Sequence, residues 1–231
     1  MFQGVLKHGD PTAAVARPDY HRLARLVPAR RTRLRLHPHD GPGRREVEAY
    51  VGAAYARAFG GRIRNHYPTL MSVEDLDGQI LAAAGYRLAG DDTLFLEAYL
   101  DRPIETVVAD RLQAPVFRRQ IAEIGNLASD CRGASLFLYL AMGRRLQRKG
   151  CAYAVATATV QLRRRFARLG FPTAALAPAE AWRLGATAAD WGRYYDHGPE
   201  VRVGVIDPAL RPLARALDEP SSANDAAAAL S

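Results

Sequence analysis

Cysteine is scarce in this sequence of 231 residues. The two cysteines, Cys131 and Cys151, form neither a CxxC pair nor a Cys/His cluster, and the six histidines show no HExxH spacing. This pattern excludes a disulfide-rich scaffold and argues against a metal site. It also favours a reducing compartment, and we expect a cytoplasmic protein that holds no metal.

Lysine is equally scarce, and its scarcity changes the meaning of the charge. Lys7 and Lys149 stand against thirty arginines, in a chain with a formal net charge of +8 and an isoelectric point near 9.9. A coding bias toward arginine produces such a charge without any polyanionic partner. The basic residues are also scattered, and they do not alternate with aromatic side chains along one stripe. We therefore expect no nucleic-acid partner.

Long apolar runs are absent as well. The longest, at 134–142 and 152–160, fall far short of the roughly 20 residues that cross a bilayer as a helix. The first ten residues, MFQGVLKHGD, lack the apolar stretch of a signal peptide. We expect no integral membrane association and no export by that route.

What the chain does contain is typical of one globular domain. Hydrophobic residues make up 48% and charged residues 24% of the sequence, and the mean hydropathy is -0.19. Proline and arginine concentrate before residue 31, and the end, EPSSANDAAAALS, is small and polar. We predict a flexible basic extension over 1–30, one folded domain over 31–217 and a disordered tail over 218–231.

The first half of the domain has the pattern of a strand, a helix and a hairpin. Leu34 and Leu36 alternate with basic residues, as in a half-buried strand. A Pro-Gly turn then introduces a helical apolar pattern, and Asp77-Gly78 is a dipeptide favoured in tight hairpin turns. The predicted elements are a strand at 32–37, a helix at 44–59 and hairpin strands at 70–73 and 80–88.

The second half alternates strands with helices. Its central run, CAYAVATATV, is small and apolar throughout, which is typical of a strand covered on both faces. Gly125 lies inside another predicted strand, where a glycine often marks a bulge. The predicted elements are strands at 116–128, 151–160, 173–176 and 202–206 and helices at 134–148 and 161–169. This order predicts an α/β fold with a mixed sheet and helices on both faces.

Three segments resemble the thermostable hemolysin family: LFLEAYLDRPIE at 94–105, EIGNLA at 123–128 and WGRYYD at 191–196. The helix start at Gly133 and the closing segment FARLGF also resemble the GNAT acyltransferases, to which the acyl-homoserine-lactone synthases are related. The resemblance covers about residues 32–206. It implies a GNAT-like, mostly antiparallel central sheet. It also implies transfer of an acyl group from acyl-CoA or acyl carrier protein to a small amine.

Glu123 and Asn126 are the first candidate site residues. A bulge at Gly125 would turn both side chains to one face of the strand, which a regular strand would not do. Acyl transfer to an amine needs a base, so Glu123 is the leading catalytic carboxylate and Asn126 a substrate contact. The alternative for Glu123 is an ion pair with one of the many arginines. The lactone synthases typically carry arginine at the position of Asn126.

The helix start after residue 131 is the candidate donor site. Free N–H groups and the helix dipole favour a phosphate there, and Gly133 permits close approach. The resemblance implies that the donor contacts Leu127, Ala128, Arg132, Gly133, Ala134 and Ser135. The GNAT pattern Arg/Gln-x-x-Gly-x-Gly/Ala is altered at both ends here, to Asp130 and Ser135.

Two readings of this altered pattern stay open. The phosphopantetheine of an acyl carrier protein has a single phosphate and needs fewer donors than coenzyme A, and an acidic carrier suits a charge of +8. The alternative is a helix capped by aspartate that binds no ligand.

Polar residues are also dense at 97–105. Glu97 and Asp101 are four residues apart and share a face, so they could hold a cationic amine. Glu97 is thus a second catalytic candidate, with Tyr99 and Asp101 as substrate contacts. A solvated surface face is the alternative. Tyr195 is a candidate to protonate the leaving thiolate, as tyrosines do in many GNAT enzymes, and ring packing is its alternative role.

Two other functions stay open at this point. The family name suggests a membrane-active, hemolysin-like protein, although no insertable amphipathic segment supports it. The altered phosphate pattern suggests a module that binds acyl donors without catalysis. Acyl chain length, acceptor, donor type and oligomeric state are not determined by the sequence.

Overall fold

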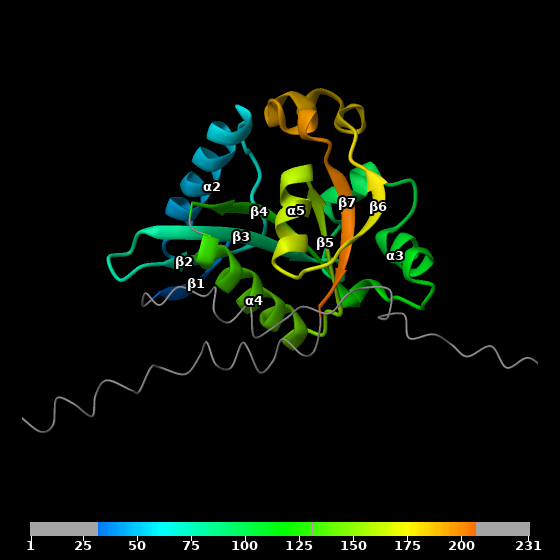
Figure 1. Cartoon of the computed structure of the whole chain (residues 1–231), viewed down its shortest axis with the longest axis horizontal. Helices are drawn as coiled ribbons and strands as arrows, with labels where there is room; N and C mark the ends of the chain where they lie inside the picture. The colour runs from blue at the N-terminus through cyan, green and yellow to red at the C-terminus, as the bar shows by residue number, and fades with distance from the viewer. Residues whose placement is uncertain (1–31, 131, 207–231) are drawn as a thin grey trace, which may run out of the picture.

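The computed structural model describes residues 32–130 and 132–206 of the chain. The predicted extension, the predicted tail and their boundaries at 30 and 217 lie outside these residues. The described residues form a seven-stranded sheet with helices on both faces (Figure 1). This confirms the predicted fold class.

The sheet is mostly antiparallel. Its strand order is β1-β2-β3-β4-β5-β7-β6, and only β4 and β5 run parallel. The strands are β1 (Arg33–Pro38), β2 (Thr69–Glu74), β3 (Ile80–Leu88), β4 (Ile121–Ser129), β5 (Tyr153–Ala158), β6 (Ala174–Pro178) and β7 (Glu200–Val205).

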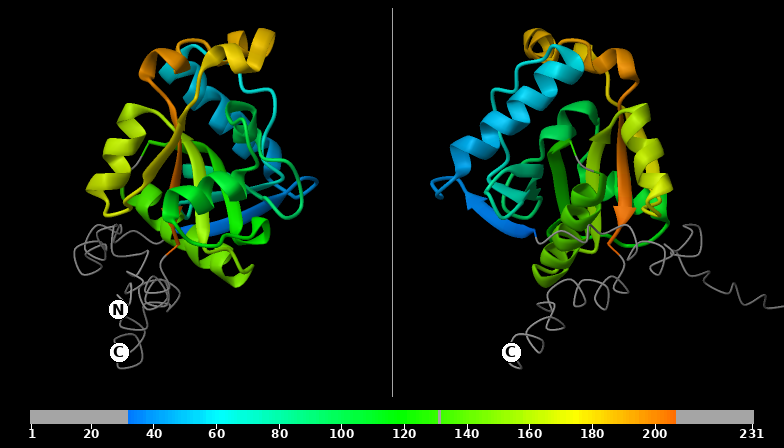
Figure 2. Two further views of the ribbon diagram at one scale, coloured as in Figure 1. Left: turned by 90° about the vertical axis from the view of Figure 1, so that its right-hand side faces the viewer. Right: turned by 60° about the vertical axis from the view of Figure 1, so that its left-hand side comes forward.

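Helices cover the two faces of this sheet. α4 and α5 lie on one face and α2 lies on the other (Figure 2). α3 shares the face of α2, packed with apolar residues of β4, β5 and β7. The α-helices are α2 (Arg44–Phe59), α3 (Ile104–Leu112), α4 (Arg132–Arg148) and α5 (Val160–Arg168), and the 3-10 helices are η2 (Phe95–Tyr99), η3 (Arg118–Gln120), η4 (Ala181–Trp191) and η5 (Tyr194–His197).

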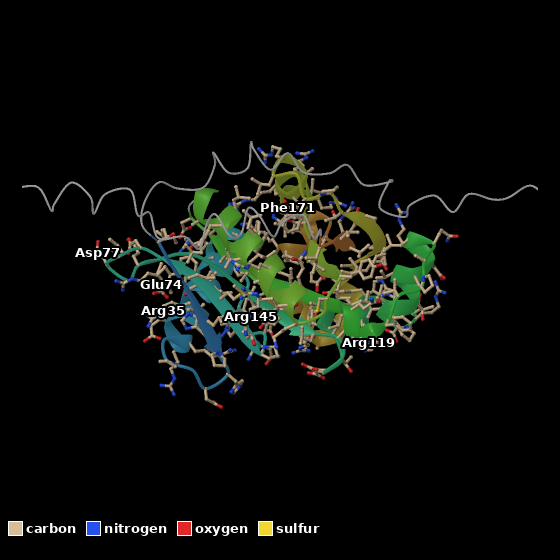
Figure 3. All side chains as sticks on the ribbon, turned by 90° about the horizontal axis from the view of Figure 1, so that it is seen from below. Arg35, Glu74, Asp77, Arg119, Arg145 and Phe171 are labelled. Carbon is tan, nitrogen blue, oxygen red and sulfur yellow. The ribbon has the colours of Figure 1, made fainter. Side chains whose placement is uncertain are left out.

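Glycines end the first helix and turn the hairpin as predicted. α2 has the predicted bounds and lies between Gly43 and Gly60, whose φ angles of 72° and 68° are costly for other residues. Gly78 has a φ of 84° in the β2–β3 turn, and Asp77 marks the outer end of that hairpin (Figure 3).

Several elements differ from the sequence prediction, among them the 3-10 helices η2, η4 and η5, which were not predicted. The segment expected as one strand from 116 begins with the turn η3, and β4 starts only at Ile121. α3 was not predicted, although Ile104 and Val108 are four residues apart and both fully buried. Its nine residues are too few to show a clear helical period in the sequence.

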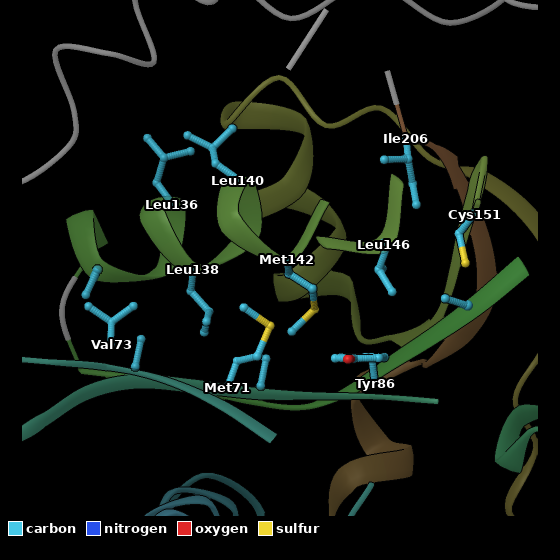
Figure 4. Packing of buried hydrophobic residues seen from close by; sticks show 14 residues of the cluster. Met71, Val73, Tyr86, Leu136, Leu138, Leu140, Met142, Leu146, Cys151 and Ile206 are labelled. Carbon is cyan, nitrogen blue, oxygen red and sulfur yellow. The ribbon is translucent and has the colours of Figure 1, made fainter. Parts of the chain in front are cut away.

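The main core lies between α4 and the sheet. Leu138 and Met142 of α4 point onto Met71 of β2 and Tyr86 of β3 (Figure 4). Each buried leucine of this kind stabilises the fold by about 1.5–3 kcal/mol. On β3, Ala82 and Ala84 face α4, whereas Ala83 between them packs beneath α2. The central strands are therefore covered on both faces.

The parallel pair β4–β5 is very short. Cα partners run only from Ile121–Tyr153 to Glu123–Val155, although β4 continues to Ser129 and β5 to Ala158. Beyond Glu123 each strand pairs only with its other neighbour, β3 or β7. The two strands therefore separate in the middle of the sheet, and the candidate site lies where they part.

Candidate active site

A cavity of about 210 Å³ lies beside the separated strands, on the face covered by α2. Ile124, Gly125 and Asn126 of β4 and Thr157 of β5 line it. Six aromatic rings complete most of its wall: Tyr55, Tyr67, Phe95, Tyr99, Trp191 and Tyr194. Each of the three segments that resemble the thermostable hemolysin family contributes to this one cavity.

Tyr67 is held from every side. Its ring lies over Gly85 and Gly125, which are paired across β3 and β4, and a Cβ on Gly125 would stand 2.4 Å from the ring. Its N–H donates to Oδ1 of Asn126 at 3.0 Å, and its carbonyl accepts from Arg44 at 2.8 Å. The phenol position is thus fixed by side chains from α2 and β4.

The predicted bulge lies one residue beyond Gly125. Asn126 and Leu127 together oppose Ala84, and Asn126 takes the left-handed conformation with a φ of 50°. Asparagine tolerates this conformation better than most residues. The predicted consequence is confirmed: Glu123 and Asn126 are on the same face, and both contact Tyr67.

Glu123 is a buried carboxylate directly below the cavity. Its side chain accepts the N–H groups of Phe95 and Leu96 at 2.8 and 3.0 Å, and it shares a hydrogen bond with the Tyr67 hydroxyl. Burial raises the pKa of Glu123, and these hydrogen bonds oppose that shift. Among the described residues no arginine forms an ion pair with it. Glu123 does not line the cavity itself, and it is connected to the cavity by its hydrogen bond with the Tyr67 hydroxyl.

The roof of the cavity comes from the end of α2 and from η4. Arg193 N–H donates to the Phe59 carbonyl at 2.8 Å, and a Cβ on Gly192 would stand 2.4 Å from the same oxygen. Only glycine permits this backbone approach. It brings Trp191 into ring contact with Phe95 at a centroid distance of 5.5 Å.

Two tyrosine hydroxyls form hydrogen bonds with the backbone of the two strands that part, one with β4 and one with β5. The Tyr55 hydroxyl has a hydrogen bond with the backbone of Leu127 on β4. The Tyr194 hydroxyl donates to the Thr157 carbonyl of β5 at 3.1 Å. Burial raises the pKa of Tyr55 to about 12, so this phenol is neutral near pH 7.

Tyr99 and Tyr195 form a pair, of which only Tyr99 lines the cavity. Their hydroxyls lie 2.8 Å apart. Burial and this hydrogen bond raise the pKa of Tyr99 above its ordinary value. Tyr195 therefore lies behind the cavity wall, where it contacts Tyr99 and the ring of Tyr194.

The structure does not bring Glu97 and Asp101 to this cavity. They line a separate open hollow of about 740 Å³ together with Arg118. Glu97 pairs with Arg118 at 2.6 Å, and this pairing lowers the pKa of the carboxyl to about 2. Asp101 pairs with Arg183 at 2.8 Å and is largely exposed. Both carboxylates already have arginine partners.

The predicted donor residues lie at the end of β4 and at the start of α4. Leu127 packs toward α4 while Ala128 lies beneath α2. At the start of α4, Gly133 is half-buried, Ala134 is in the core, and the buried Ser135 has a hydrogen bond from Arg165 of α5. Nothing is described of the Arg132 side chain.

Three residues of the cavity wall have a buried polar side-chain atom that makes no hydrogen bond to the described residues. His66 Nδ1, Arg87 Nε and Thr157 Oγ1 are buried and have no hydrogen-bond partner within the described residues. Burial lowers the pKa of His66. Within the same residues, no group of His, Cys, Asp or Glu is placed to hold a metal ion, and no helix is long and apolar enough to cross a membrane.

Several residues of this site were not singled out by sequence reasoning. Tyr55 and Tyr67 belong to α2 and to the loop that follows it, and the sequence signal for Tyr55 was only its helical spacing. Arg87 lies at the end of a hairpin strand. Trp191 was part of a resembling segment, but its place in the cavity wall depends on contacts between distant parts of the chain.

A family model described as thermostable hemolysin matches residues 37–210. No curated protein matches the sequence.

Several solved structures share the fold. The AHL synthase LasI superposes with a TM-score of 0.53 at 10% sequence identity, covering 81% of this chain and 96% of LasI. BjaI, a CoA-dependent acyl-homoserine lactone synthase solved with SAM and isopentyl-CoA, gives 0.53 at 14% identity, with 83% and 92% covered. FeeM, an N-acyl amino acid synthase from uncultured soil microbes, gives 0.52 at 14% identity, with 80% and 99% covered. These likenesses confirm the GNAT-like fold.

Proposed function

The chain belongs to the thermostable hemolysin family, and on that premise we propose that it is an acyltransferase. It would move an acyl group from acyl-CoA, or from the phosphopantetheine of an acyl carrier protein, to a small amine. The observation that supports this proposal is the parting of β4 and β5 beside a cavity lined by Tyr67, whose hydroxyl is hydrogen-bonded to the buried carboxylate of Glu123.

The carboxylate supplies the base that the reaction needs. An ammonium acceptor must lose a proton before its nitrogen attacks a thioester. Glu123 is only 1% exposed and reaches the cavity through the Tyr67 hydroxyl. We assign Tyr67 as the group that passes the proton from the amine to Glu123. Asn126 holds Tyr67 in place, and Tyr99 lines the cavity as a contact for the acceptor.

The start of α4 fits the phosphate of an acyl donor. A 17-residue helix presents free N–H groups at its first turn, and Gly133 leaves room for close approach. Arg165 reaches this turn through its hydrogen bond to Ser135 and adds positive charge. Where the strands part, β4 and β5 no longer bond to each other, so an extended pantetheine arm could lie between them.

The similar structures support this choice of reaction class. Their names describe synthases of acyl-homoserine lactones or of N-acyl amino acids, and one is called CoA-dependent. Each of those product names contains an acyl group. We therefore propose transfer to nitrogen, without naming the chain length of the acyl group.

The deciding experiment measures thiol release and product mass for the purified protein. It uses acyl-CoAs and acyl carrier proteins of several chain lengths with a panel of small primary amines. We expect amide product from at least one donor, and a sharp loss of turnover in Glu123→Gln while its thermal unfolding remains cooperative. Unchanged turnover in that variant would remove Glu123 from the mechanism.

Two other outcomes would replace the proposal. Donor binding in a thermal-shift assay without transfer to any amine would indicate a non-catalytic binding module. Dye release from anionic lipid vesicles, with no donor binding, would indicate a membrane-active protein.

A further inference from the structure

Arg87 of β3 stands directly opposite Glu123 of β4 in the antiparallel pairing of these strands. The side chain of Glu123 does not pair with it, because its two oxygens accept the N–H groups of Phe95 and Leu96. Arg87 instead lines the cavity, with its guanidinium carbon 5.8 Å from the centroid of the Tyr67 ring. The cavity therefore has a guanidinium beside the phenol that connects it to Glu123.

The Arg87 guanidinium keeps a hydrogen-bond donor without a partner. Its Nη1 donates to the Thr93 carbonyl at 2.8 Å and lies 3.8 Å from a carboxylate oxygen of Asp92, which is largely exposed. Its Nε is buried and has no hydrogen-bond partner within the described residues. Nε–H and one N–H of Nη2 lie side by side on the edge away from Nη1, and this fork matches the two oxygens of a carboxylate. A bound carboxylate would thus satisfy a buried donor that is costly to leave unpaired.

Arginines outnumber carboxylates along the cavity wall. Arg62 and Arg64 line the cavity together with Arg87, and Asp190 is the only carboxylate among the described lining residues. Asp190 pairs with Arg64 at 2.7 Å, so its charge is already matched. The described wall therefore carries a net positive charge, which attracts an anionic group and opposes a second ammonium group on the acceptor.

We propose that the acceptor is an amino acid, whose carboxylate binds the Arg87 guanidinium while its amine faces Tyr67. This inference rests on the proposed acyltransferase function. Because the guanidinium and the phenol are neighbours, the amine and the carboxylate belong on the same or on adjacent carbon atoms, as in α- and β-amino acids. The remaining atoms meet the aromatic wall, which favours an apolar side chain, and a cavity of about 210 Å³ suits a ligand smaller than most drugs. Transfer then gives an N-acyl amino acid and the free thiol of the donor.

Binding of L-norleucine and L-norleucinamide tests this inference without an acyl donor. The two probes share the amine and the apolar side chain, but only norleucine carries a carboxylate. By isothermal titration we expect the wild type to bind norleucine about 10- to 100-fold more tightly than the amide, the size typical of hydrogen bonds to a charged group. In Arg87→Gln we expect this preference to fall below about 3-fold, with affinity for the amide unchanged.

Two further variants separate the role of the fork from a general loss of charge or of folding. Arg87→Lys keeps the charge and removes the fork, and we expect it to fold and to show an intermediate preference. Arg119→Gln is the matched control, because Arg119 (Figure 3) also lies over an aromatic ring, that of Phe117 at 4.7 Å. Arg119 lines neither the cavity nor the open hollow, so we expect the wild-type preference in this variant.

The possible results distinguish this inference from the proposed function. Absence of norleucine binding, equal binding of both probes, or an unchanged preference in Arg87→Gln and Arg87→Lys would overturn the inference. Transfer to putrescine and not to norleucine would also overturn it, while the acyltransferase function would stand. Selective binding of norleucine through Arg87 without transfer from any donor would support the carboxylate site and overturn the acyltransferase function.

Discussion

The ring of Tyr67 lies so close to Gly125 that a Cβ on that glycine would stand 2.4 Å from it. Gly125→Ala must therefore displace Tyr67 or bend β4. We expect the free energy of unfolding to fall by about 1–3 kcal/mol, as for other overpacked sites, and turnover to fall with the displaced phenol. Urea titration and the amide-forming assay measure the two effects.

Gly52 supplies the control for that substitution. It lies inside α2, and a Cβ there would meet nothing within 4 Å. Gly52→Ala is expected to stabilise the protein by about 0.5–1 kcal/mol because alanine is the better helix former. A Gly125→Ala protein as stable and as active as wild type would contradict the role given to the Tyr67 contact.

We expect the free energy of unfolding to decrease at low pH because Glu97 becomes protonated. Its pKa of about 2 lies below the ordinary value of 4.5, because Arg118 and two backbone N–H groups stabilise the carboxylate. A lowered pKa in the folded state gives stability that is complete above about pH 4.5 and lost as the pH falls toward 2. The contribution is at most about 3 kcal/mol.

Glu97→Gln should remove that pH dependence. We expect the variant to be less stable than wild type at pH 7 and to match it more closely near pH 2.5, as followed by chemical denaturation at each pH. Asp110→Asn is the control, because its pair with Arg102 is more than half exposed on both sides and contributes about 0–1 kcal/mol. A constant difference between Glu97→Gln and wild type at every pH would refute the assignment.

Arg165 should contribute to donor affinity through charge. Arg165→Gln removes the guanidinium next to Ser135, and we expect donor affinity to fall by about 5- to 20-fold at low salt and by less at 0.5 M salt. Arg164→Gln is the matched control, one position away on the exposed side of α5. Isothermal titration with a non-hydrolysable acyl-CoA measures both variants, and equal effects would exclude a specific contact.

Elements with a strong local signal were predictable. Gly43 and Gly60 delimit α2 at the predicted residues because both take positive φ angles, and Asp77-Gly78 turns the hairpin for the same reason. α3 was missed because its signal is short, although Pro103 precedes it as a common helix start.

Only those features of the site that depend on the residue pattern within one strand could be predicted from the sequence. Period-two alternation interrupted by a bulge was enough to place Glu123 and Asn126 on one face. It could not show why Gly125 is a glycine, because the reason is the ring of Tyr67, 58 residues away in the chain. Glu97 also looked like a substrate ligand until Arg118 was found beside it. Such partners are set by tertiary packing, which a linear pattern does not contain.

The brief pairing of β4 with β5 has a mechanical consequence. Three residue pairs join a half-sheet of β1 to β4 to a half-sheet of β5 to β7. Splaying the halves further apart around this seam breaks no additional ladder hydrogen bond, because none joins the strands beyond Glu123 and Val155. The two half-sheets can therefore open about this short seam without loss of strand pairing, like two plates joined by a hinge.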